Sequence, residues 1–474
     1  MKKDHWIHKI HLPNWLVGIL ALVLILRIPT FFEPYYYGDE MIYMTLGQGI
    51  RQGLPLYSEM FDNKPPLLYL TAAIAGNLFW FKTILAFWSL ATTVAFWKLV
   101  KGKMATLIFA LLISLPLLEG NTANAELFMI GPTILAFYML LTKKLTIKNL
   151  IISGFLFGIA ALFKIPASFE VPTIVVFWVI TQGMGKWRTI FKNTFYLFVG
   201  FIIPILLTFI WYFIKGGLKQ YVEAAFLQNV GYIGSWGVEV PLPLRAGLII
   251  LGVLLLFVVS KKISKDFLFA CLWLIFSLFA VTLSGRPYPH YLVQSVGPIA
   301  ILLGMFFTSR NIEQALVVIP LTVAFFIPIY YNFYHYKTRD YYLRFVNFTT
   351  GKISRATYFD QFSPNTQRNY KIADFLIKSS LPHQRVFIWD SDSPTIYALS
   401  RRLPPIKFVA DYHINDYYTK TKLVGDLAEK KPRFIVLTSK HPLPEIMNFI
   451  RKEYILIHQI EDANIYSKLE TITL

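Results

Sequence analysis

The chain has 474 residues, of which 55% are hydrophobic, 17% aromatic and only 15% charged. Soluble proteins carry about a quarter charged residues, so this composition excludes an ordinary soluble enzyme and predicts a polytopic membrane protein. The formal net charge of +19 lies in short Lys and Arg clusters between apolar runs, which is typical of membrane proteins and excludes a nucleic-acid partner.

Apolar runs recur along the first three quarters of the chain, and a membrane helix needs roughly 20 such residues. The first run follows a charged start without a small-residue cleavage site, which predicts an uncleaved signal anchor. We predict about eleven membrane helices, near residues 14–32, 83–99, 104–118, 126–141, 150–164, 167–181, 193–214, 244–260, 267–285, 292–308 and 315–331.

The basic clusters predict the orientation of these helices. The clusters at 98–103, 143–148, 185–192 and 261–265 share one side if the N-terminus, with Lys2, Lys3 and Lys9, is cytoplasmic. Residues 33–82 then form one long outer loop, and its segment 65–81 is expected to be an interfacial or re-entrant helix. If that segment crossed, every later loop would change sides. The prediction is a multi-pass protein of the plasma (inner) membrane.

Residues 340–474 lack long apolar runs and predict a small extracytoplasmic α/β domain, distinct from a transmembrane catalytic domain over residues 1–335. Neither a glycine-rich phosphate loop nor a dinucleotide motif occurs in it. Expected strands cover residues 385–390, 433–439, 454–460 and 463–469, and expected amphipathic helices cover 393–402, 421–431 and 442–454.

Ionisable residues at the edge of a membrane are functional candidates, because charge is costly near hydrocarbon. Each also has a structural interpretation: acids favour helix starts, and Pro65 and Pro66 suit the first turn of a helix. For Lys164 and Glu170, which flank a proline-containing break, we favour the structural role. The candidates expected around one outer cavity are Asp39, Glu40, Asp62, Lys64, Glu126, Lys164, Glu170, Arg286 and His290.

An acid among cations at this interface fits transfer of a sugar from a lipid phosphate. A carboxylate can take a proton from an attacking hydroxyl, and cations can stabilise charge on a departing phosphate. One alternative is a transporter or flippase of a lipid-linked or small anionic substrate, although the internal repeats common in transporters are absent from the sequence. A structural or sensory membrane protein is another alternative.

Several motifs together resemble the GT-C glycosyltransferases. They are the Asp39-Glu40 pair, "DNKPPLLY", "NAELFMIGPTILAFYML", "GIAALFKIPA" and "GRPYPHYLVQSVGPIAILLG". The likeness, over roughly residues 14–310, is closest to the bacterial branch of glycosyltransferase family 39, which includes lipid A aminoarabinose transferases and relatives of protein mannosyltransferases. It implies a GT-C-like fold, a polyprenyl-phosphate sugar donor, an inverting displacement and a catalytic acid in the first outer loop.

The resemblance implies residue roles. Asp39 would be the general base with Glu40 as its neighbour, while Lys64, Arg286 and His290 would contact the donor phosphate. Asp62, Glu126 and His290 are candidates for metal or acceptor contact, and a divalent metal ion stays open as a cofactor. Asn63 stands where the aminoarabinose branch has Glu, which argues against a metal ligand there and against aminoarabinose.

The expected partners are a polyprenyl-phosphate-linked sugar and membrane lipids. The acceptor surface is expected on the outer loops, including residues 215–243, and on the C-terminal domain. The sequence does not specify the sugar, the acceptor or the oligomeric state.

Overall fold

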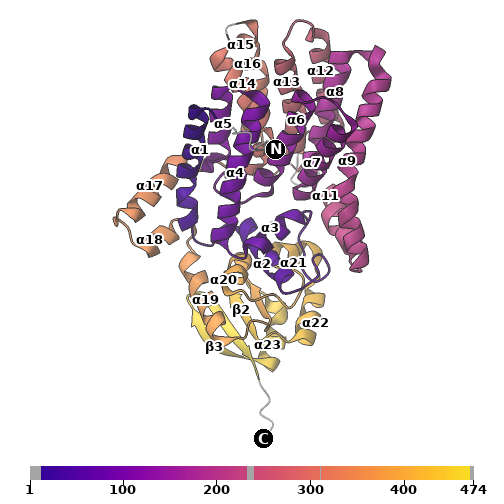
Figure 1. The fold of residues 1–474 in the computed structure, drawn as a ribbon. Coiled ribbons are helices and arrows are strands. Elements are labelled where there is room, and N and C mark those ends of the chain that lie inside the picture. The colour runs from indigo at the N-terminus through magenta and orange to yellow at the C-terminus, as the bar shows by residue number, and fades with distance from the viewer. Residues whose placement is uncertain (1–11, 232–239, 285, 310, 470–474) are drawn as a thin grey trace, which may run out of the picture.

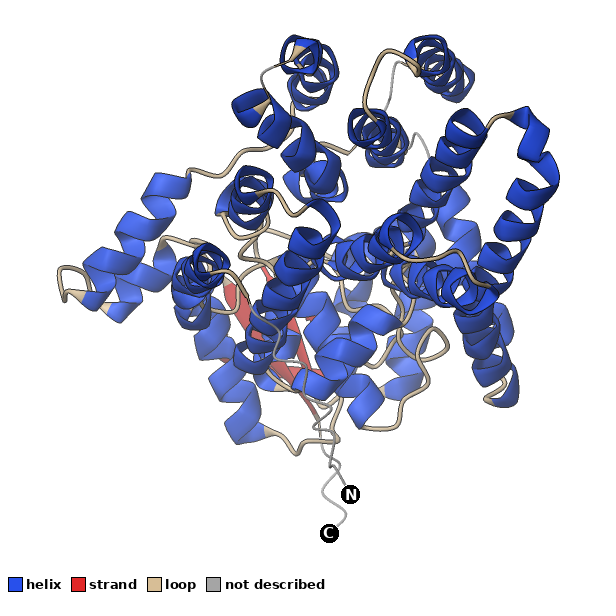
Figure 2. Ribbon diagram, turned by 45° about the horizontal axis from the view of Figure 1, so that its top comes forward, coloured by secondary structure: helices blue, strands red, loops and turns tan. Residues whose placement is uncertain are grey.

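The computed structural model describes residues 12–231, 240–284, 286–309 and 311–469. Lys2, Lys3, Lys9 and part of the loop 215–243 lie outside these described residues. The described chain forms a large bundle of helices with an α/β part packed against one end of it (Figure 1). In the view of Figure 2 the strands are again confined to the α/β part.

Helices form in all eleven predicted membrane segments. Nine segments among the described residues are long and apolar enough to cross a bilayer by length and composition, while α5 and α7 are shorter. The helices are α1 (Asn14–Arg27), α4 (Leu78–Val100), α5 (Lys103–Leu112), α6 (Ala125–Thr142), α7 (Ile147–Phe163), α8 (Val171–Gln182), α9 (Trp187–Ile214), α12 (Leu242–Val259), α13 (Lys265–Thr282), α14 (Val296–Thr308) and α16 (Val318–Tyr330).

Three of these helices expose large apolar side chains, as expected for surfaces that face lipid. Phe213 of α9 is 70% exposed, Val258 of α12 is 75% exposed and Ile329 of α16 is 72% exposed. Such a band of apolar surface would be unfavourable in water and is matched by the hydrocarbon of a bilayer.

A proline changes one of the predicted boundaries, and prolines mark a second place where the chain breaks as predicted. α5 ends at Leu112, earlier than the predicted residue 118, and Pro116–Leu118 forms a 3₁₀ turn. Proline disfavours a helical conformation in the residue before it, which explains the shorter helix. Between α7 and α8 the chain forms the 3₁₀ turn Ile165–Glu170, so the predicted break is present.

The first loop contains two helices, α2 (Gly38–Arg51) and α3 (Leu67–Ala75). With nine residues, α3 is about 14 Å long, less than half of the hydrocarbon thickness. The prediction of a single helix over residues 65–81 is wrong at its C-terminal end, because α3 ends at Ala75 and α4 begins at Leu78. Gly76 has φ +70° and ends α3, and the side chain of Asn77 accepts from Trp80 N to begin α4.

The α/β part has one four-stranded sheet in the order β1-β2-β4-β3. β1 and β2 are parallel, and the other pairs are antiparallel. The sheet consists of β1 (Val386–Trp389), β2 (Phe434–Thr438), β3 (Tyr454–Ile460) and β4 (Ala463–Lys468). Its helices are α19 (Thr366–Ser379), α20 (Ser393–Ser400), α21 (Asp411–Tyr417), α22 (Lys420–Lys430) and α23 (Met447–Glu453).

The residues just before this part do not pack on the sheet. α17 (Thr338–Thr349) and α18 (Arg355–Asp360) form an arm beside α1 (Figure 1). The Tyr342 hydroxyl donates to Leu26 O at 3.0 Å, and the Tyr341 hydroxyl donates to Glu33 Oε1 at 2.6 Å. The arm therefore connects the last membrane helix to the sheet along the outside of the bundle.

The first loop holds the two parts together. Phe61 N donates to Lys407 O at 2.8 Å, and Gln48 Nε2 of α2 donates to Arg401 O at 2.5 Å. α2 also packs against α20. The acidic start of α2 consequently lies at the junction between the bundle and the α/β part.

Candidate active site

A cavity of about 550 Å³ opens at this junction. Its walls come from the first loop, the turn after α7, the segment between α13 and α14, and α21. The residues of these walls include Asp39, Asp62, Asn63, Lys64, Lys164, Arg286, Tyr288, His290, Tyr291, Tyr412, His413, Asp416 and Tyr417. Chain segments that are far apart in the sequence thus supply both carboxylates and cations to one space.

Asp39 stands in the first turn of α2, where the helix dipole favours a negative charge. Its Oδ2 accepts from the Tyr43 hydroxyl at 2.8 Å and lies 3.7 Å from Lys64 Nζ. Burial raises the pKa of Asp39, but the charges of Lys64 and then His290 outweigh it and hold that pKa below its usual value. The side chain keeps 33% exposure, so an ionised carboxylate faces the cavity.

Lys64 lies between two carboxylates. Its Nζ is 3.7 Å from Asp39 Oδ2 and 3.8 Å from Asp62 Oδ2. Asp62 is held in place because the Tyr69 hydroxyl donates to the same Oδ2 at 2.7 Å, and Lys64 N donates to that hydroxyl at 3.1 Å. Tyr69 belongs to α3, the helix that follows Pro66. This helix therefore holds both Asp62 and the backbone of Lys64 through the Tyr69 hydroxyl.

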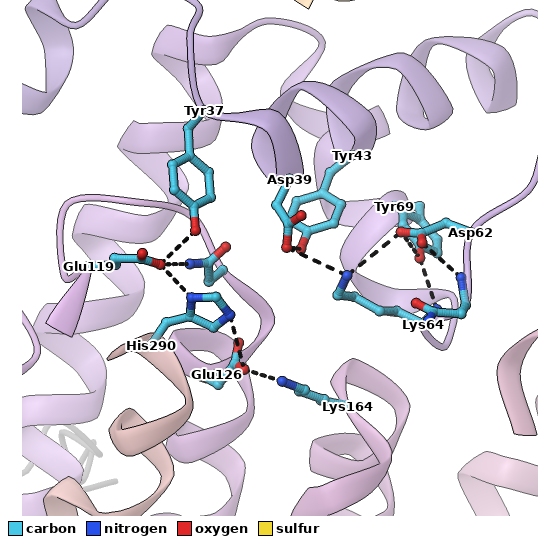
Figure 3. Close-up of polar contacts among 12 residues, drawn as sticks. Tyr37, Asp39, Tyr43, Asp62, Lys64, Tyr69, Glu119, Glu126, Lys164 and His290 are labelled. Atoms are coloured by element: carbon cyan, nitrogen blue, oxygen red, sulfur yellow. Dashed lines mark hydrogen bonds and ion pairs between the residues drawn. The ribbon is translucent and has the colours of Figure 1, made fainter. Parts of the chain in front are cut away.

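A second line of polar residues runs along the facing wall (Figure 3). Glu119 Oε2 accepts from the Tyr37 hydroxyl at 2.7 Å and pairs with His290 Nδ1. His290 Nε2 lies 3.8 Å from Glu126 Oε1, and Glu126 pairs with Lys164. This buried series holds the imidazole of His290 and the ammonium of Lys164 at the cavity.

Six of the nine predicted residues meet in this cavity. Asp39, Asp62, Lys64, Arg286 and His290 all line it. Lys164, for which we favoured a structural role, lines it as well, and its Nζ lies 3.8 Å from the centre of the Tyr291 ring.

Three predicted residues lie elsewhere. Glu126 stands behind Lys164 and lines a neighbouring cavity. Glu170 is buried and accepts from Trp273 Nε1 at 2.5 Å. Glu40 is 1% exposed and pairs at 2.6 Å with Lys82 Nζ of α4. Burial raises the pKa of Glu40 despite this cation, and the structure does not bring its carboxylate into the cavity.

Some residues of the site carried no sequence signal strong enough to find them. Glu119 lies just before the quoted run "NAELFMIGPTILAFYML", but only the fold shows that it contacts His290. His413 comes from the α/β part, and its Nε2 lies 3.7 Å from Asp62 Oδ1. A lone His or Glu is too common in sequences to indicate such a contact.

An apolar cavity of about 240 Å³ adjoins the polar one. The two share Lys164, Ile165, Asn229 and Tyr291. The remaining lining of the smaller cavity is mostly apolar and includes Phe169, Phe226, Ala280, Val281 and Leu283. A molecule that occupied both cavities would therefore need a polar end and an apolar end, with the change of polarity at Lys164.

The donor set does not fit a divalent metal ion. Within residues 12–231, 240–284, 286–309 and 311–469, no group of three His, Cys, Asp or Glu side chains could hold one. The ammonium of Lys64 lies 3.7 Å from Asp39 Oδ2 and 3.8 Å from Asp62 Oδ2, so these two carboxylates already share a cation. No step of the chemistry below involves a metal.

Solved structures with a similar fold cover nearly the whole chain. ArnT from Cupriavidus metallidurans bound to undecaprenyl phosphate is 12% identical, with a TM-score of 0.60 over 97% of this chain and 98% of that chain. The apo state of ArnT from the same organism is 12% identical, with a TM-score of 0.54 over 96% and 98%. The predicted GT-C-like fold is confirmed, and the chain is a multi-pass membrane protein.

Sequence comparisons cover only the C-terminal part. Residues 366–468 match the family described as "Putative competence-induced protein Ccs4 C-terminal domain". The curated proteins contain no match.

Proposed function

We propose that this protein is a membrane glycosyltransferase that moves a sugar from a polyprenyl-phosphate donor to an acceptor hydroxyl. The observation that carries this proposal is the shared wall at Lys164, where a cavity with an ionised carboxylate and several cations adjoins an apolar cavity. A sugar linked to a lipid phosphate has that division into polar and apolar ends. The ligand of the structurally similar ArnT, undecaprenyl phosphate, is the lipid-phosphate part of such a donor.

The cations would bind the phosphate of the donor. With the lipid tail in the apolar cavity, the phosphate lies near Lys164 and faces Lys64 and Arg286 across the polar cavity. These three side chains stabilise the negative charge that grows on the phosphate as the sugar departs. Such interactions are strong in a site that excludes most water.

Asp39 would act as the general base. The acceptor oxygen attacks the anomeric carbon from the side opposite the phosphate, and its proton passes to the Asp39 carboxylate. The bond between the anomeric carbon and the phosphate oxygen breaks, and its electron pair stays on the phosphate. The configuration at the anomeric carbon is thereby inverted. The Tyr43 hydroxyl and Lys64 orient the carboxylate for this transfer.

The reaction would take place at the extracytoplasmic face of the plasma membrane. This side follows from the basic clusters between the helices, which the positive-inside rule assigns to the cytoplasm. Glu40 has no chemical step in this mechanism, because its carboxylate pairs with Lys82 away from the cavity.

The substitution Asp39→Asn tests the proposal in purified protein reconstituted in liposomes with a labelled polyprenyl-phosphate sugar. Transfer should fall by about 10²–10⁴-fold, the usual contribution of a general base, while binding of undecaprenyl phosphate persists. The control Asp374→Asn changes an exposed carboxylate of α19 that pairs with Lys378, and it should leave transfer unchanged. Unchanged transfer in Asp39→Asn would remove Asp39 as the base. Movement of the donor across the bilayer without transfer would favour a flippase instead.

A further inference from the structure

One wall of the polar cavity has no part in the mechanism so far. The short helix α21 of the α/β part contributes Tyr412, His413, Asp416 and Tyr417 to that wall. None of them lines the apolar cavity, so α21 does not lie along the proposed path of the lipid tail. Figure 1 shows α21 beside α2 and α3, at the junction of the two parts.

Aromatic contacts set the position of α21 relative to the first loop. The ring of Phe61 lies 5.2 Å from those of His413 and Tyr417, and 5.1 Å from that of Phe408. The backbone bond from Phe61 N to Lys407 O holds the same segment. α21 is therefore placed against the loop that carries Asp62 and Lys64 and does not rest on the sheet alone.

His413 brings the α/β part within reach of the charged groups. Its Nε2 lies 3.7 Å from Asp62 Oδ1, and Asp62 lies 3.8 Å from Lys64, the partner of Asp39. The side chain is 4% exposed, and its Nδ1 has no hydrogen-bond partner within the described part of the chain. A buried polar atom without a partner is uncommon in folded proteins, and here it belongs to a residue that lines a cavity.

The chemistry of this wall selects for hydroxyl groups. Carboxylates such as those of Asp62 and Asp416 accept hydrogen bonds and repel anions. Tyr412 and Tyr417 are 44% and 42% exposed and offer apolar ring faces with a polar tip. An uncharged sugar, with hydroxyl donors on its edge and C–H groups on its faces, matches both features. A lipid chain would meet no aliphatic side chain of α21 in the cavity lining.

We propose that α21 is the acceptor subsite and that the acceptor is an uncharged sugar residue of a glycan. This inference rests on the proposed function and names its second substrate. The sugar packs against Tyr412 and Tyr417, and its hydroxyls bind Asp416 and His413. The attacking hydroxyl then enters the cavity toward Asp39, past the pair formed by Asp62 and His413.

The test uses the full-length protein in liposomes with a labelled polyprenyl-phosphate sugar. The acceptor probes are the polysaccharide, lipid and protein fractions of the cell envelope from a strain that lacks the protein. Label should pass to the polysaccharide. The substitutions Tyr417→Ala and Asp416→Asn should raise KM for the polysaccharide by about tenfold, with KM for the donor unchanged. Tyr417→Phe keeps the ring and should recover most of the affinity, and Asp374→Asn serves again as the surface control.

A binding measurement separates this inference from the proposed function. The Asp39→Asn variant should bind polysaccharide, labelled separately for this measurement, without transferring sugar to it. The double variant Asp39→Asn/Tyr417→Ala should bind that polysaccharide more weakly. Transfer of label to the lipid or protein fraction, no binding of polysaccharide, or α21 variants that raise KM for the donor would each overturn the inference. Retained transfer in Asp39→Asn alone would overturn the assigned base and leave the acceptor subsite standing.

Discussion

Among the neighbouring charged side chains, Lys64 has the largest effect on the pKa of Asp39. Burial favours the protonated acid, whereas Lys64 Nζ, at 3.7 Å from Oδ2, favours the carboxylate. The net effect is a pKa below the usual value for an aspartate. Lys64 would therefore serve both substrates, because it would bind the donor phosphate and keep the base ready for the acceptor.

We expect the substitution Lys64→Met to shift the pH dependence of transfer. Without the ammonium, burial raises the pKa of Asp39, so a higher pH is needed to form the active carboxylate. The acid limb of kcat/KM should move to higher pH, and binding of undecaprenyl phosphate should weaken by about tenfold or more. Lys64→Arg keeps the charge and should leave the acid limb in place. Identical acid limbs for Lys64→Met and the unmodified protein would contradict this account.

At the scale of the element, the geometry of α2 separates two adjacent acids. Successive side chains on a helix point about 100° apart, and in α2 Asp39 lines the cavity whereas Glu40 does not. Glu40 points toward α4, where Lys82 Nζ lies 2.6 Å from it and 2.9 Å from Glu33 Oε2. This buried triad of Glu33, Glu40 and Lys82 ties α2 to the membrane bundle.

The substitution Glu40→Gln tests this division of roles. Lys82 loses one of its two carboxylates, so the free energy of unfolding should fall by about 1–3 kcal/mol, measured by thermal unfolding in detergent. kcat should stay close to that of the unmodified protein, unlike in Asp39→Asn. The control Glu429→Gln, on the exposed face of α22, should change neither. Unaltered stability combined with a loss of kcat as deep as that of Asp39→Asn would make Glu40 a catalytic residue.

In the molecule as a whole, the polar cavity lies where the helix bundle and the α/β part meet. The bundle supplies Asp39 and the cations, and the α/β part supplies α21. Phe61 is the central contact between them, since it is buried among three rings of the α/β part. Replacing Phe61 would therefore open the wall of the cavity while every charged residue of the chain stays unchanged.

We expect Phe61→Ala to loosen α21 selectively. Removing a buried Phe costs about 3–5 kcal/mol of packing, and here that packing lies at the junction. Hydrogen exchange should become faster in α21 and around Phe408, while β2 and β4 keep their protection. Phe96→Ala removes a ring of equal size that stacks on Phe109 inside the bundle, and it should leave exchange in α21 unchanged. Equal exchange of α21 in both variants would show that Phe61 does not hold the two parts together.

The elements and the broad class of the protein could be predicted from the amino-acid sequence alone. Apolar runs placed the eleven helices, and short runs of β-branched and aromatic residues placed the four strands, because burial and backbone preference are properties of neighbouring residues. The proximity of Lys64 to Asp39 could also be predicted, since both belong to the first outer loop.

Most contacts between charged residues, in contrast, are set by how the helices pack and could not be predicted from the sequence. Glu119 and His290 are 171 residues apart in the chain, and no local pattern records that they pair. The fold also turned Glu40 toward Lys82 and brought His413 from the α/β part beside Asp62. Pair interactions between charges depend on distance in space, and that distance is set only when helices from distant parts of the chain have packed.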